Sequence, residues 1–341
     1  MSISFDGRVA IVTGAGAGLG RSHAMLLASR GAKVVVNDLG GAVDGTSGSA
    51  APADKVVDEI KAAGGTAVAN YDSVSDPTGA ANIVKTAVDA FGKVDILVNN
   101  AGILRDRSFT KMDAETWNAV VAVHLNGTAY VTMAAWPVMR ENGYGRIVLT
   151  ASNSGLYGNF GQANYGAAKA GMVGLMNVLK QEGRKYNILV NTLAPMATTR
   201  MTEELMPPEA VKLLQPELVS PGVAYLCSET NEESGIVLSA GGGYFARIQV
   251  MGSEGVFMEP GTEVTPEMVA DQFAKICDMS KAQNFDSSTA ELQYLFSKQI
   301  KGGAMSLSQQ IAHVTPEFRA LVQRCTKVRE FLDAIVPNMD T

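Results

Sequence analysis

The sequence predicts an α/β fold in which a doubly wound parallel sheet of about seven strands is followed by a C-terminal helical extension. Two observations predict this class. Short apolar runs with the length of buried strands alternate with helical patterns along the chain, as expected for a parallel sheet covered on both faces. The first apolar run, residues 9–12, ends in a glycine-rich turn that leads straight into a helical pattern.

The composition is that of a globular protein without a nucleic-acid or membrane partner. The 341 residues are 46% hydrophobic and 18% charged, with a net charge of -6 and a pI near 5.2. Such a chain offers no basic face to a polyanion. No basic segment followed by an apolar one opens the chain, and no apolar run approaches the length of a membrane span. We therefore expect a soluble, cytoplasmic protein.

The glycine-rich turn after the first strand predicts a nucleotide-binding site. Residues 13–20 read Thr-Gly-Ala-Gly-Ala-Gly-Leu-Gly, and a helix is predicted from residue 21 to residue 30. Glycines at such a turn let the backbone approach a pyrophosphate at the helix N-terminus, which is the Rossmann arrangement. Any tight connection from strand to helix would also use glycine. The expected cofactor contacts here are Gly14, Ala17, Gly18, Leu19 and Gly20.

An acidic residue at the end of the second strand predicts which dinucleotide binds. Residues 33–37 form a strand pattern, and Asp38 follows it about twenty residues beyond the glycines. A carboxylate there accepts hydrogen bonds from both hydroxyls of an adenine ribose and repels a 2′-phosphate, so NAD is expected rather than NADP. The alternative is an acidic residue that only starts the next loop, residues 40–53, which we expect to be a mobile surface loop.

Polar and small residues follow the third and fourth strand patterns, residues 66–70 and 94–98. After the third strand, Ser73 and Val74 are expected where an adenine ring would lie. The asparagines after the fourth strand can tie neighbouring strands together or line the cofactor cleft, and the sequence is compatible with either role. The expected cofactor contacts at this point are Asn100, Ala101 and Gly102.

A tyrosine and a lysine four residues apart predict the chemistry. Tyr165 and Lys169 lie on one face of a helical pattern, where the ammonium would favour the ionised phenol and lower its pKa from about 10 towards about 7. One cation at about 4 Å in an effective dielectric of about 20 supplies the roughly 4 kcal/mol that this shift requires. The spacing alone is weak evidence, because Tyr294 and Lys298 share it. The first pair differs in having Ser152 thirteen residues before the tyrosine, at the end of a buried strand pattern.

These motifs together resemble the short-chain dehydrogenase/reductase family. The resemblance rests on the glycine turn, on Asn-Asn-Ala-Gly at residues 99–102, on Ser152, and on Tyr165 with Lys169. Further segments are similar to the (3R)-hydroxyacyl-CoA dehydrogenase part of peroxisomal multifunctional enzyme type 2, also known as a type 4 17β-hydroxysteroid dehydrogenase. The hydratase and sterol-carrier parts of that enzyme are absent, which implies a stand-alone dehydrogenase. The similar segments are residues 37–41, 69–74, 102–109 and 157–165.

The resemblance implies a role for each matching residue. Tyr165 would be the general acid and base, and Lys169 would lower the pKa of Tyr165 and hold the nicotinamide ribose. Ser152, like Tyr165, would bind the substrate oxygen. Asn126 would hold a water molecule beside the lysine, forming a proton path to solvent. The simpler explanation of Asn126 is an asparagine inside a helix, bonded to the backbone.

The loop after the strand pattern at residues 187–193 is expected to contact the nicotinamide. Met196 stands where members of the family often carry glycine. Met196, Met201 and Met206 lie in this loop, and flexible thioether side chains suit either a lid over an acyl chain or a sterol, or ordinary core packing. The cofactor contacts that the resemblance implies in this loop are Ala197, Thr198 and Thr199.

Two domains are expected, an NAD-binding domain at residues 1–250 and a helical extension at residues 251–341. Helical patterns cover about residues 266–279, 287–300 and 315–336, and the last is strongly amphipathic. Packing on its own subunit is the default expectation for this last helix. Our hypothesis is that it crosses to a partner subunit and narrows the substrate cleft. The resemblance implies a homodimer or a homotetramer.

The expected reaction is the NAD-dependent oxidation of a secondary alcohol, and the resemblance implies a (3R)-3-hydroxyacyl-CoA as the substrate. Arg105, Arg107 and Arg200 could meet CoA phosphates or be ordinary solvated arginines. A 17β-hydroxysteroid dehydrogenase acting on free steroid alcohols is the alternative within the same class. A nucleotide-sensing or scaffold protein without catalysis is the alternative in another class. No metal site is predicted, because the three cysteines and three histidines are scattered.

Overall fold

The computed structural model describes residues 2–42, 44–46, 48–198 and 207–299. The chain divides into two compact units, Met1–Gln249 and Val250–Thr341. Several residues named above lie outside the described residues, namely Thr199, Arg200, Met201, Met206 and the helical pattern at 315–336.

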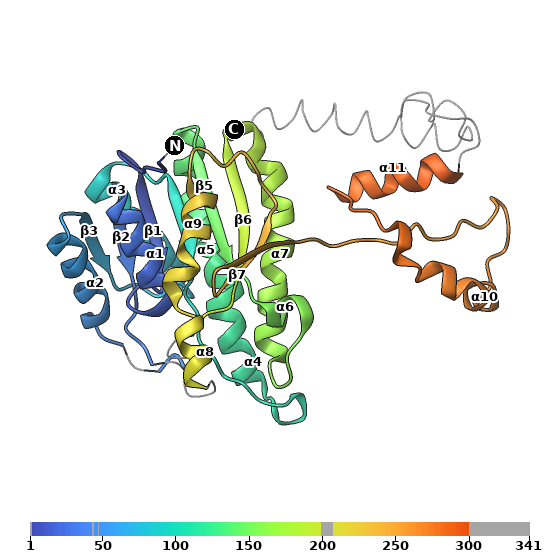
Figure 1. Cartoon of the computed structure of the whole chain (residues 1–341), viewed down its shortest axis with the longest axis horizontal. Coiled ribbons are helices and arrows are strands. Elements are labelled where there is room, and N and C mark those ends of the chain that lie inside the picture. Colours follow the sequence, from blue (N-terminus) through green and yellow to red (C-terminus); the bar gives the residue numbers. More distant parts are fainter. Residues whose placement is uncertain (1, 43, 47, 199–206, 300–341) are drawn as a thin grey trace. The chain divides into compact units, whose positions relative to one another are not determined.

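The first unit is built on one eight-stranded sheet, and the predicted α/β fold is confirmed (Figure 1). The strand order is β3-β2-β1-β4-β5-β6-β7-β8, and all neighbours run parallel except β7 and β8. From β1 the chain adds β2 and β3 on one side and then returns to add β4 on the other side of β1. Sheets of this kind bind ligands at such a switch point, here between β1 and β4. The strands are β1 Val9–Thr13, β2 Lys33–Asn37, β3 Thr66–Asn70, β4 Ile96–Asn99, β5 Gly145–Thr150, β6 Ile188–Pro195, β7 Val237–Gly241 and β8 Tyr244–Ile248.

The eighth strand is an addition to the predicted sheet. β8 pairs with β7 through a tight turn in which Gly242 and Gly243 have φ angles of 59° and 79°. In the sequence these glycines resemble an exit turn after the last strand. The residues of β8 are half-buried or exposed, so β8 lacks the apolar run by which the other strands were recognised. Its pairing with β7, rather than its own composition, makes it a strand.

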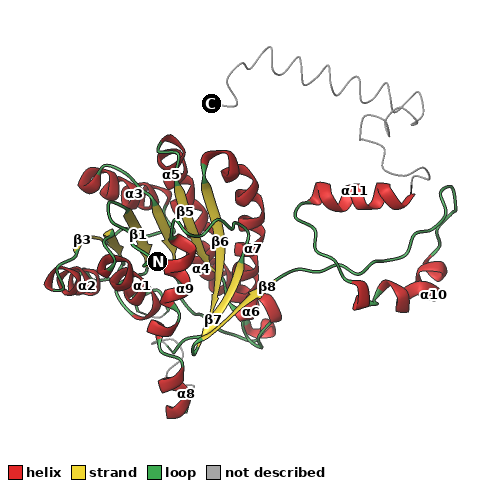
Figure 2. Cartoon of the chain, turned by 45° about the horizontal axis from the view of Figure 1, so that its top comes forward, coloured by secondary structure: helices red, strands yellow, loops and turns green. Residues whose placement is uncertain are grey.

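Helices cover both faces of the sheet (Figure 2). Strand residues alternate between the faces, as the twofold period of a strand requires: Ala10 and Val12 pack with α1, α2 and α9, whereas Val9 and Ile11 pack with α3, α5 and α7. The helices of the first face are α1 Gly18–Ser29, α2 Ala51–Ala62 and α9 Ser220–Cys227, and those of the second are α3 Pro77–Phe91, α5 Gly127–Glu141 and α7 Ala163–Gly183.

α2 begins inside the segment that was expected to be a loop. Its first residue is Ala51, and Pro52 lies in its first turn, where proline is favoured because its missing N–H would have no helical partner anyway. The loop after Asp38 therefore ends about three residues earlier than the composition suggested.

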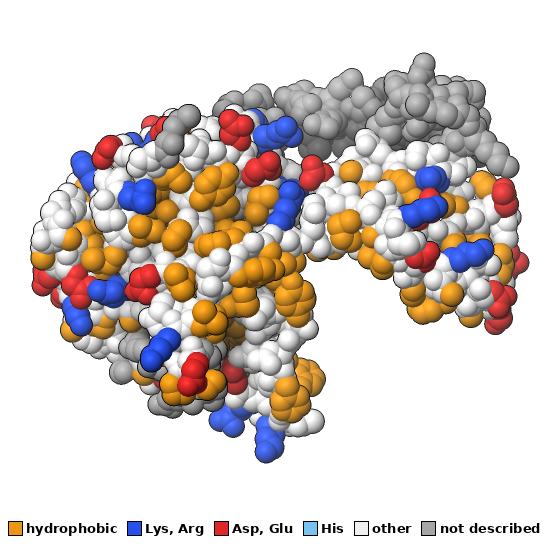
Figure 3. Space-filling model, in the orientation of Figure 1, with side chains coloured by type: hydrophobic (Ala, Val, Ile, Leu, Met, Phe, Trp, Pro, Cys, Tyr) orange, Lys and Arg blue, Asp and Glu red, His pale blue; other side chains and the backbone are white. Residues whose placement is uncertain are grey.

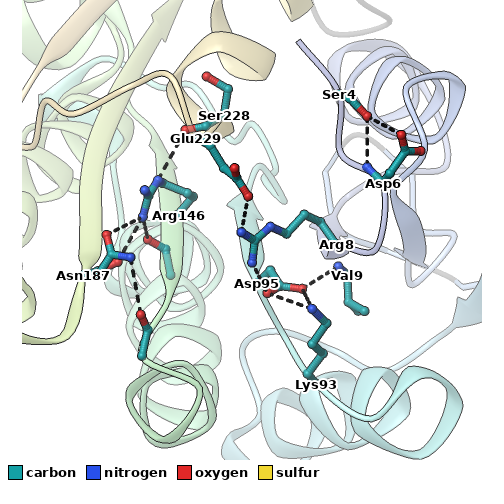
Figure 4. Close-up of polar contacts among 12 residues, drawn as sticks. Ser4, Asp6, Arg8, Val9, Lys93, Asp95, Arg146, Asn187, Ser228 and Glu229 are labelled. Atoms are coloured by element: carbon teal, nitrogen blue, oxygen red, sulfur yellow. Dashed lines mark hydrogen bonds and ion pairs between the residues drawn. The ribbon is translucent and has the colours of Figure 1, made fainter.

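Charged residues hold the edge of the sheet at which the central strands begin (Figure 4). Asp95, 1% exposed, directly precedes β4. It accepts hydrogen bonds from the backbone N–H of Val9 at 2.8 Å and from the guanidinium of Arg8 at 3.0 Å, and it pairs with Lys93 at 3.0 Å. Both carboxylate oxygens are therefore bonded, and the start of β1 is tied to the start of β4.

The second unit is described as far as Gln299. Its helices α10 (Pro266–Ile276) and α11 (Ser288–Gln299) fall within two of the predicted helical patterns, and neither helix has a buried residue. The rings of Phe257 and Phe285 lie 5.9 and 5.5 Å from that of Tyr294. Across the described parts of both units, no helix has the length and apolar character needed to cross a membrane.

Candidate active site

The turn between β1 and α1 leaves no room for side chains. Gly14 has a φ angle of +62°, and a Cβ atom on it would lie 2.7 Å from the Cα of Ala101. A Cβ on Gly20 would lie 2.2 Å from the carbonyl oxygen of Gly14. Ala17 gives α1 no side-chain cap, so the first N–H groups of the helix remain available to an anion such as a pyrophosphate. Of the predicted contacts, Gly14 directly follows β1, Ala17 precedes α1, and Gly18, Leu19 and Gly20 form the first turn of α1.

Asp38 directly follows β2 and is held by the backbone of two loops. Its Oδ2 accepts the N–H of Gly16 at 2.7 Å, and its Oδ1 accepts the N–H of Gly40 at 2.7 Å. A carboxylate oxygen can accept more than one hydrogen bond, so both oxygens retain the capacity to bind a ribose hydroxyl. The carboxylate thus lies directly beside the glycine turn. The turn and Asp38 together fit a dinucleotide whose adenine ribose carries free hydroxyls.

Asn100 performs one of the two roles that its sequence allowed. Its Nδ2 donates to the carbonyl oxygens of Thr13 at 3.1 Å and Gly14 at 3.0 Å, and its backbone N–H donates to the hydroxyl of Thr13 at 3.0 Å. The N–H of Ala101 donates to the same hydroxyl at 3.1 Å. Asn100 therefore ties the end of β4 to the end of β1 and fixes the glycine turn.

Ser73 and Val74 lie beyond β3, Ser73 beside the first turn of α3 and Val74 beside the start of α5. The hydroxyl of Ser73 is 2.9 Å from that of Ser75. Val74 is buried, and a Cβ on Gly127 would lie 2.8 Å from its Cγ2. Contact of these two residues with an adenine ring stays a prediction.

Ser152, Tyr165 and Lys169 come together beyond the carboxyl end of β5. Ser152 caps the short helix α6 (Asn153–Tyr157) by accepting one of its N–H groups at 3.2 Å, and its hydroxyl lies close enough to Tyr165 to lower the pKa of the phenol. Lys169, 4% exposed, donates to the carbonyl oxygen of Thr150 at 2.5 Å. Its Nζ lies 5.6 Å from the centre of the Tyr165 ring. The structure therefore assembles the three residues that the sequence singled out.

Burial opposes the charge states that were predicted for this pair. Desolvation raises the pKa of Tyr165; the hydrogen bond with Ser152 lowers it, and the carboxylate of Asp106 raises it further. Desolvation also lowers the pKa of Lys169 to about 7. The prediction that Lys169 lowers the pKa of Tyr165 is therefore wrong for the protein alone. Lys169 is buried and its ammonium is bonded to the carbonyl of Thr150, whereas Tyr165 is half-buried.

Asn126 and His124 lie in a π-helical segment, η2 (Ala122–Asn126), which joins α4 (Ala114–Val121) to α5. Asn126 is exposed, and its side chain makes no hydrogen bond to another described residue. The simpler explanation, a bond to helix backbone, is thus wrong, and the water-holding role stays a prediction. His124 is buried, and its ring lies 5.1 Å from the ring of Tyr165. Sequence reasoning missed it, although it stands two residues before Asn126.

Asn164 is a second residue that sequence reasoning missed. It is fully buried, and its Nδ2 donates to the carbonyl oxygens of Arg105 at 3.1 Å and Thr116 at 3.3 Å. Its Oδ1 accepts the N–H of Tyr165 at 2.8 Å. These bonds anchor the first turn of α7 and therefore the backbone of the tyrosine. The adjacency of an asparagine to Tyr165 was the available signal.

The arginines that were considered for CoA phosphates differ in their contacts. Arg105 donates from Nε to the carbonyl oxygen of Asp44 at 2.8 Å. Arg107 is exposed. Contact of either arginine with a CoA phosphate stays a prediction.

Ala197 and Thr198 follow β6 at the same edge of the sheet. Thr198 is buried and donates its N–H to the carbonyl oxygen of Leu214 at 2.6 Å. The departure from glycine at Met196 is accommodated by the neighbouring strand, because Gly241 has no side chain there; a Cβ on Gly241 would lie 2.6 Å from the Cβ of Met196. Contact of this loop with a nicotinamide stays a prediction.

The pair Tyr294 and Lys298 shows what the four-residue spacing does by itself. Its ammonium lies 5.4 Å from the ring centre, almost as in the pair of α7. Lys298 is exposed, however, and the hydroxyl of Tyr294 donates to the carbonyl oxygen of Glu254 at 3.0 Å. Burial beside Ser152, rather than spacing, distinguishes Tyr165 and Lys169. In the part of the chain that the structure describes, no group of three or more His, Cys, Asp or Glu side chains is placed to hold a metal ion.

Known proteins with similar sequences were found for most of the chain. Residues 8–210 match the family described as short chain dehydrogenase. The chain is 55% identical over 276 residues to the short-chain type dehydrogenase/reductase Rv0148 of Mycobacterium tuberculosis, covering 81% of this chain and 96% of that protein. It is 51% identical over 284 residues to peroxisomal multifunctional enzyme type 2 of Drosophila melanogaster, covering 83% and 47%. It is 43% identical over 212 residues to hydroxyacyl-CoA dehydrogenase ChsB1 of Mycobacterium tuberculosis, covering 59% and 64%.

Solved structures are similar as well. The structure of the full-length Drosophila melanogaster enzyme superposes with a TM-score of 0.73 and 42% identity, covering 88% of this chain and 52% of that one. A 7α-hydroxysteroid dehydrogenase in complex with NADH and 7-oxo glycochenodeoxycholic acid superposes with a TM-score of 0.64 and 31% identity, covering 70% and 95%. The chain thus spans about half the length of the Drosophila enzyme.

Proposed function

Because the chain belongs to the short-chain dehydrogenase/reductase family and is an oxidoreductase, we propose that it oxidises a secondary alcohol with NAD, most specifically a (3R)-3-hydroxyacyl-CoA to the 3-oxoacyl-CoA. The observation that carries the proposal is the meeting of Ser152, Tyr165 and Lys169 beyond β5. They lie at the same edge of the sheet as the glycine turn. Parallel α/β sheets place their ligands at this edge.

The chain's own residues need to move one proton and hold one oxygen. Tyr165 takes the hydroxyl proton of the alcohol, as a general base within hydrogen-bond reach. Ser152, whose hydroxyl lies beside the phenol, holds the same substrate oxygen. Lys169 holds the nicotinamide ribose and supplies positive charge near the phenol while it is protonated. Asn126 connects the lysine to solvent through a water molecule.

NAD is the proposed cofactor. The support is Asp38, whose carboxylate lies beside the glycine turn with capacity for ribose hydroxyls and would repel a 2′-phosphate. When bound, the nicotinamide would accept the hydride that leaves the carbinol carbon of the alcohol. The residues proposed to hold the dinucleotide are Gly14, Ala17, Gly18, Leu19, Gly20, Asp38, Ser73, Val74, Asn100, Ala101, Gly102, Tyr165, Lys169, Ala197, Thr198 and Thr199.

The acyl-CoA substrate is supported by the names of relatives. One relative is named a hydroxyacyl-CoA dehydrogenase, and others are peroxisomal multifunctional or hydratase-dehydrogenase-epimerase enzymes. A free steroid alcohol is the second candidate, favoured by the likeness to a hydroxysteroid dehydrogenase bound to a 7-oxo bile acid. A cytoplasmic location stays a prediction, since several relatives are named as peroxisomal.

We propose a homodimer or homotetramer. Met133 on α5 is 61% exposed and Val178 on α7 is 53% exposed, so the outer faces of these helices carry apolar side chains that a second subunit would cover. The helical extension from residue 251 would then cover the substrate side or a subunit interface.

The test is a substrate panel followed by NADH absorbance, with 3-hydroxyacyl-CoA esters of both configurations and several chain lengths in one arm and steroid alcohols in the other. We expect turnover of (3R)-esters, and Tyr165→Phe should cut it by a factor of about 100 or more while cofactor binding persists. Turnover confined to steroid alcohols would select the second candidate. If no alcohol were oxidised, the scaffold alternative would return.

A further inference from the structure

A buried histidine touches the reacting tyrosine and has no role in the reaction as proposed. His124 is 3% exposed, and its ring meets that of Tyr165 at a centroid distance of 5.1 Å with 86° between the planes. This edge-to-face arrangement is attractive and directional for aromatic rings. A ring held in this way limits how far the phenol can tilt.

The imidazole is itself fixed by the backbone that follows β4. Its Nε2 lies 2.8 Å from the carbonyl oxygen and 3.1 Å from the N–H nitrogen of Ile103. One nitrogen either donates or accepts, so each tautomer makes one of these bonds. On the other side, a Cβ on Gly102 would lie 2.2 Å from the Cε1 of His124. Only glycine at this position lets the ring approach so closely.

The helix that carries His124 is irregular at the position of this contact. Residues 122–126 form a π-helical turn within an otherwise α-helical stretch, and such turns are frequent at functional sites because they displace one side chain from its regular position. The Nδ1 atom of His124 is buried and has no hydrogen-bond partner among the described residues. An unbonded buried polar atom is costly, so a purely structural side chain at this position would be expected to be apolar.

His124 stays uncharged in the working pH range. Burial, assisted by the positive charge of Lys169, lowers its pKa to about 3. The charged groups that bear on the two rings are Lys169 and, for the phenol, the carboxylate of Asp106. Neither ring nitrogen bonds the phenol, because Nε2 faces the backbone of Ile103 and Nδ1 has no partner among the described residues. The influence of His124 on Tyr165 therefore acts through ring contact, by position and by the exclusion of water.

We propose that His124 is a positioning residue for Tyr165: its ring, locked between the backbone of Gly102 and Ile103 and the phenol, holds the phenol in its reactive orientation and keeps water from its buried side. The proposal rests on the proposed function of Tyr165 as the general base.

The first test follows the phenol directly and needs no substrate. With tyrosine labelled by ¹³C at Cζ, the Tyr165 signal among the nine tyrosines is assigned by its loss in Tyr165→Phe, and it is then titrated upwards from about pH 8 for as long as the protein stays folded. His124→Ala opens the buried side of the ring to water, so the pKa of Tyr165 should fall towards its ordinary value. His124→Phe keeps a ring in place and should leave the pKa close to that of the native protein.

His23 offers a matched control. It is 1% exposed, its pKa is likewise lowered to about 3 by burial, and it bonds Ser220 between α1 and α9, where it has no described contact with Tyr165. His23→Ala removes a buried imidazole of the same size and should leave the Tyr165 titration unchanged. If His124→Ala fails to fold, His124→Gln replaces it, because glutamine removes the ring and keeps a group able to bond Ile103.

The second test measures turnover with the alcohol that the panel identifies. We expect His124→Ala and His124→Gln to lower kcat about tenfold or more, with little change in the KM for NAD, while His124→Phe and His23→Ala stay within about threefold. An unchanged titration of Tyr165 in both ring-deleting variants, or an equal effect of His23→Ala, would overturn the proposal. If no alcohol were turned over at all, the proposed function would fail, and the titration would still decide the role of His124.

Discussion

The two buried histidines should make the stability of this protein fall steeply in mildly acidic solution. His23 and His124 are 1% and 3% exposed, and burial lowers the pKa of each from 6.5 to about 3. The unfolded chain binds a proton at each histidine as the pH drops below 6.5, whereas the folded chain does not. The contribution of the two uncharged imidazoles to the free energy of unfolding is therefore complete above about pH 6.5 and is lost as the pH falls towards 3.

The magnitude follows from the two pKa values. At about pH 5 the solution is roughly 1.5 units below the unfolded pKa, and each unit corresponds to about 1.4 kcal/mol, so each histidine costs about 2 kcal/mol. Together they should lower the free energy of unfolding by about 4 kcal/mol between about pH 7 and about pH 5. For a domain of this size that corresponds to a fall in Tm of roughly 8 to 16 °C.

Urea unfolding followed by circular dichroism at several pH values between these limits measures the slope. His23→Asn keeps a group that can bond Ser220 but does not titrate, so the pH dependence should fall by about half, to about 2 kcal/mol. A total change below about 1 kcal/mol over this range, or a slope that His23→Asn leaves intact, would refute the reasoning. Either result would mean that these imidazoles become protonated in the folded protein.

Four further predictions follow from the site and its support. Asp38→Ser should reduce the preference for NAD over NADP by about two to three orders of magnitude. A unit charge about 4 Å from a phosphate at an effective dielectric of about 20 is worth about 4 kcal/mol. An unchanged ratio of the two dissociation constants would mean that the ribose is bound elsewhere. Alcohol oxidation should accelerate as the pH rises above neutrality, because the raised pKa of Tyr165 makes its basic form scarce; kcat that declines over this range would exclude the phenolate as base. Asp95→Asn should lower the free energy of unfolding in urea by about 2 to 3 kcal/mol, because the charge-assisted bonds to Val9 and Arg8 weaken. The control is Asp89→Asn, which breaks the exposed ion pair of Asp89 with Lys85 and should have little effect on urea unfolding. Removing the residues after Gly302 should alter the oligomer in size-exclusion chromatography and the KM of the substrate if the extension crosses to a partner; no change in either would contradict that role.

Local patterns in the sequence determined the fold class and the identity of the reacting side chains. The alternation of apolar strands and helices, the glycine turn and the order Ser152, Tyr165, Lys169 are each readable within a short stretch of chain. Backbone sterics and the periods of helix and strand act over such short stretches. The sheet and the meeting of these three side chains agree with what those patterns predict.

The tertiary structure alone decided how those side chains behave. The role of Asn100 depends on Thr13, 87 positions away, and the setting of His124 depends on Ile103, 21 positions away. The pKa of Tyr165 is raised, opposite to the direction that its spacing from Lys169 suggested, because desolvation dominates it and the ammonium bonds the carbonyl of Thr150 instead. β8 became a strand only by pairing with β7. Burial and pairing are sums over contacts from the whole chain, so no short segment of the sequence contains them.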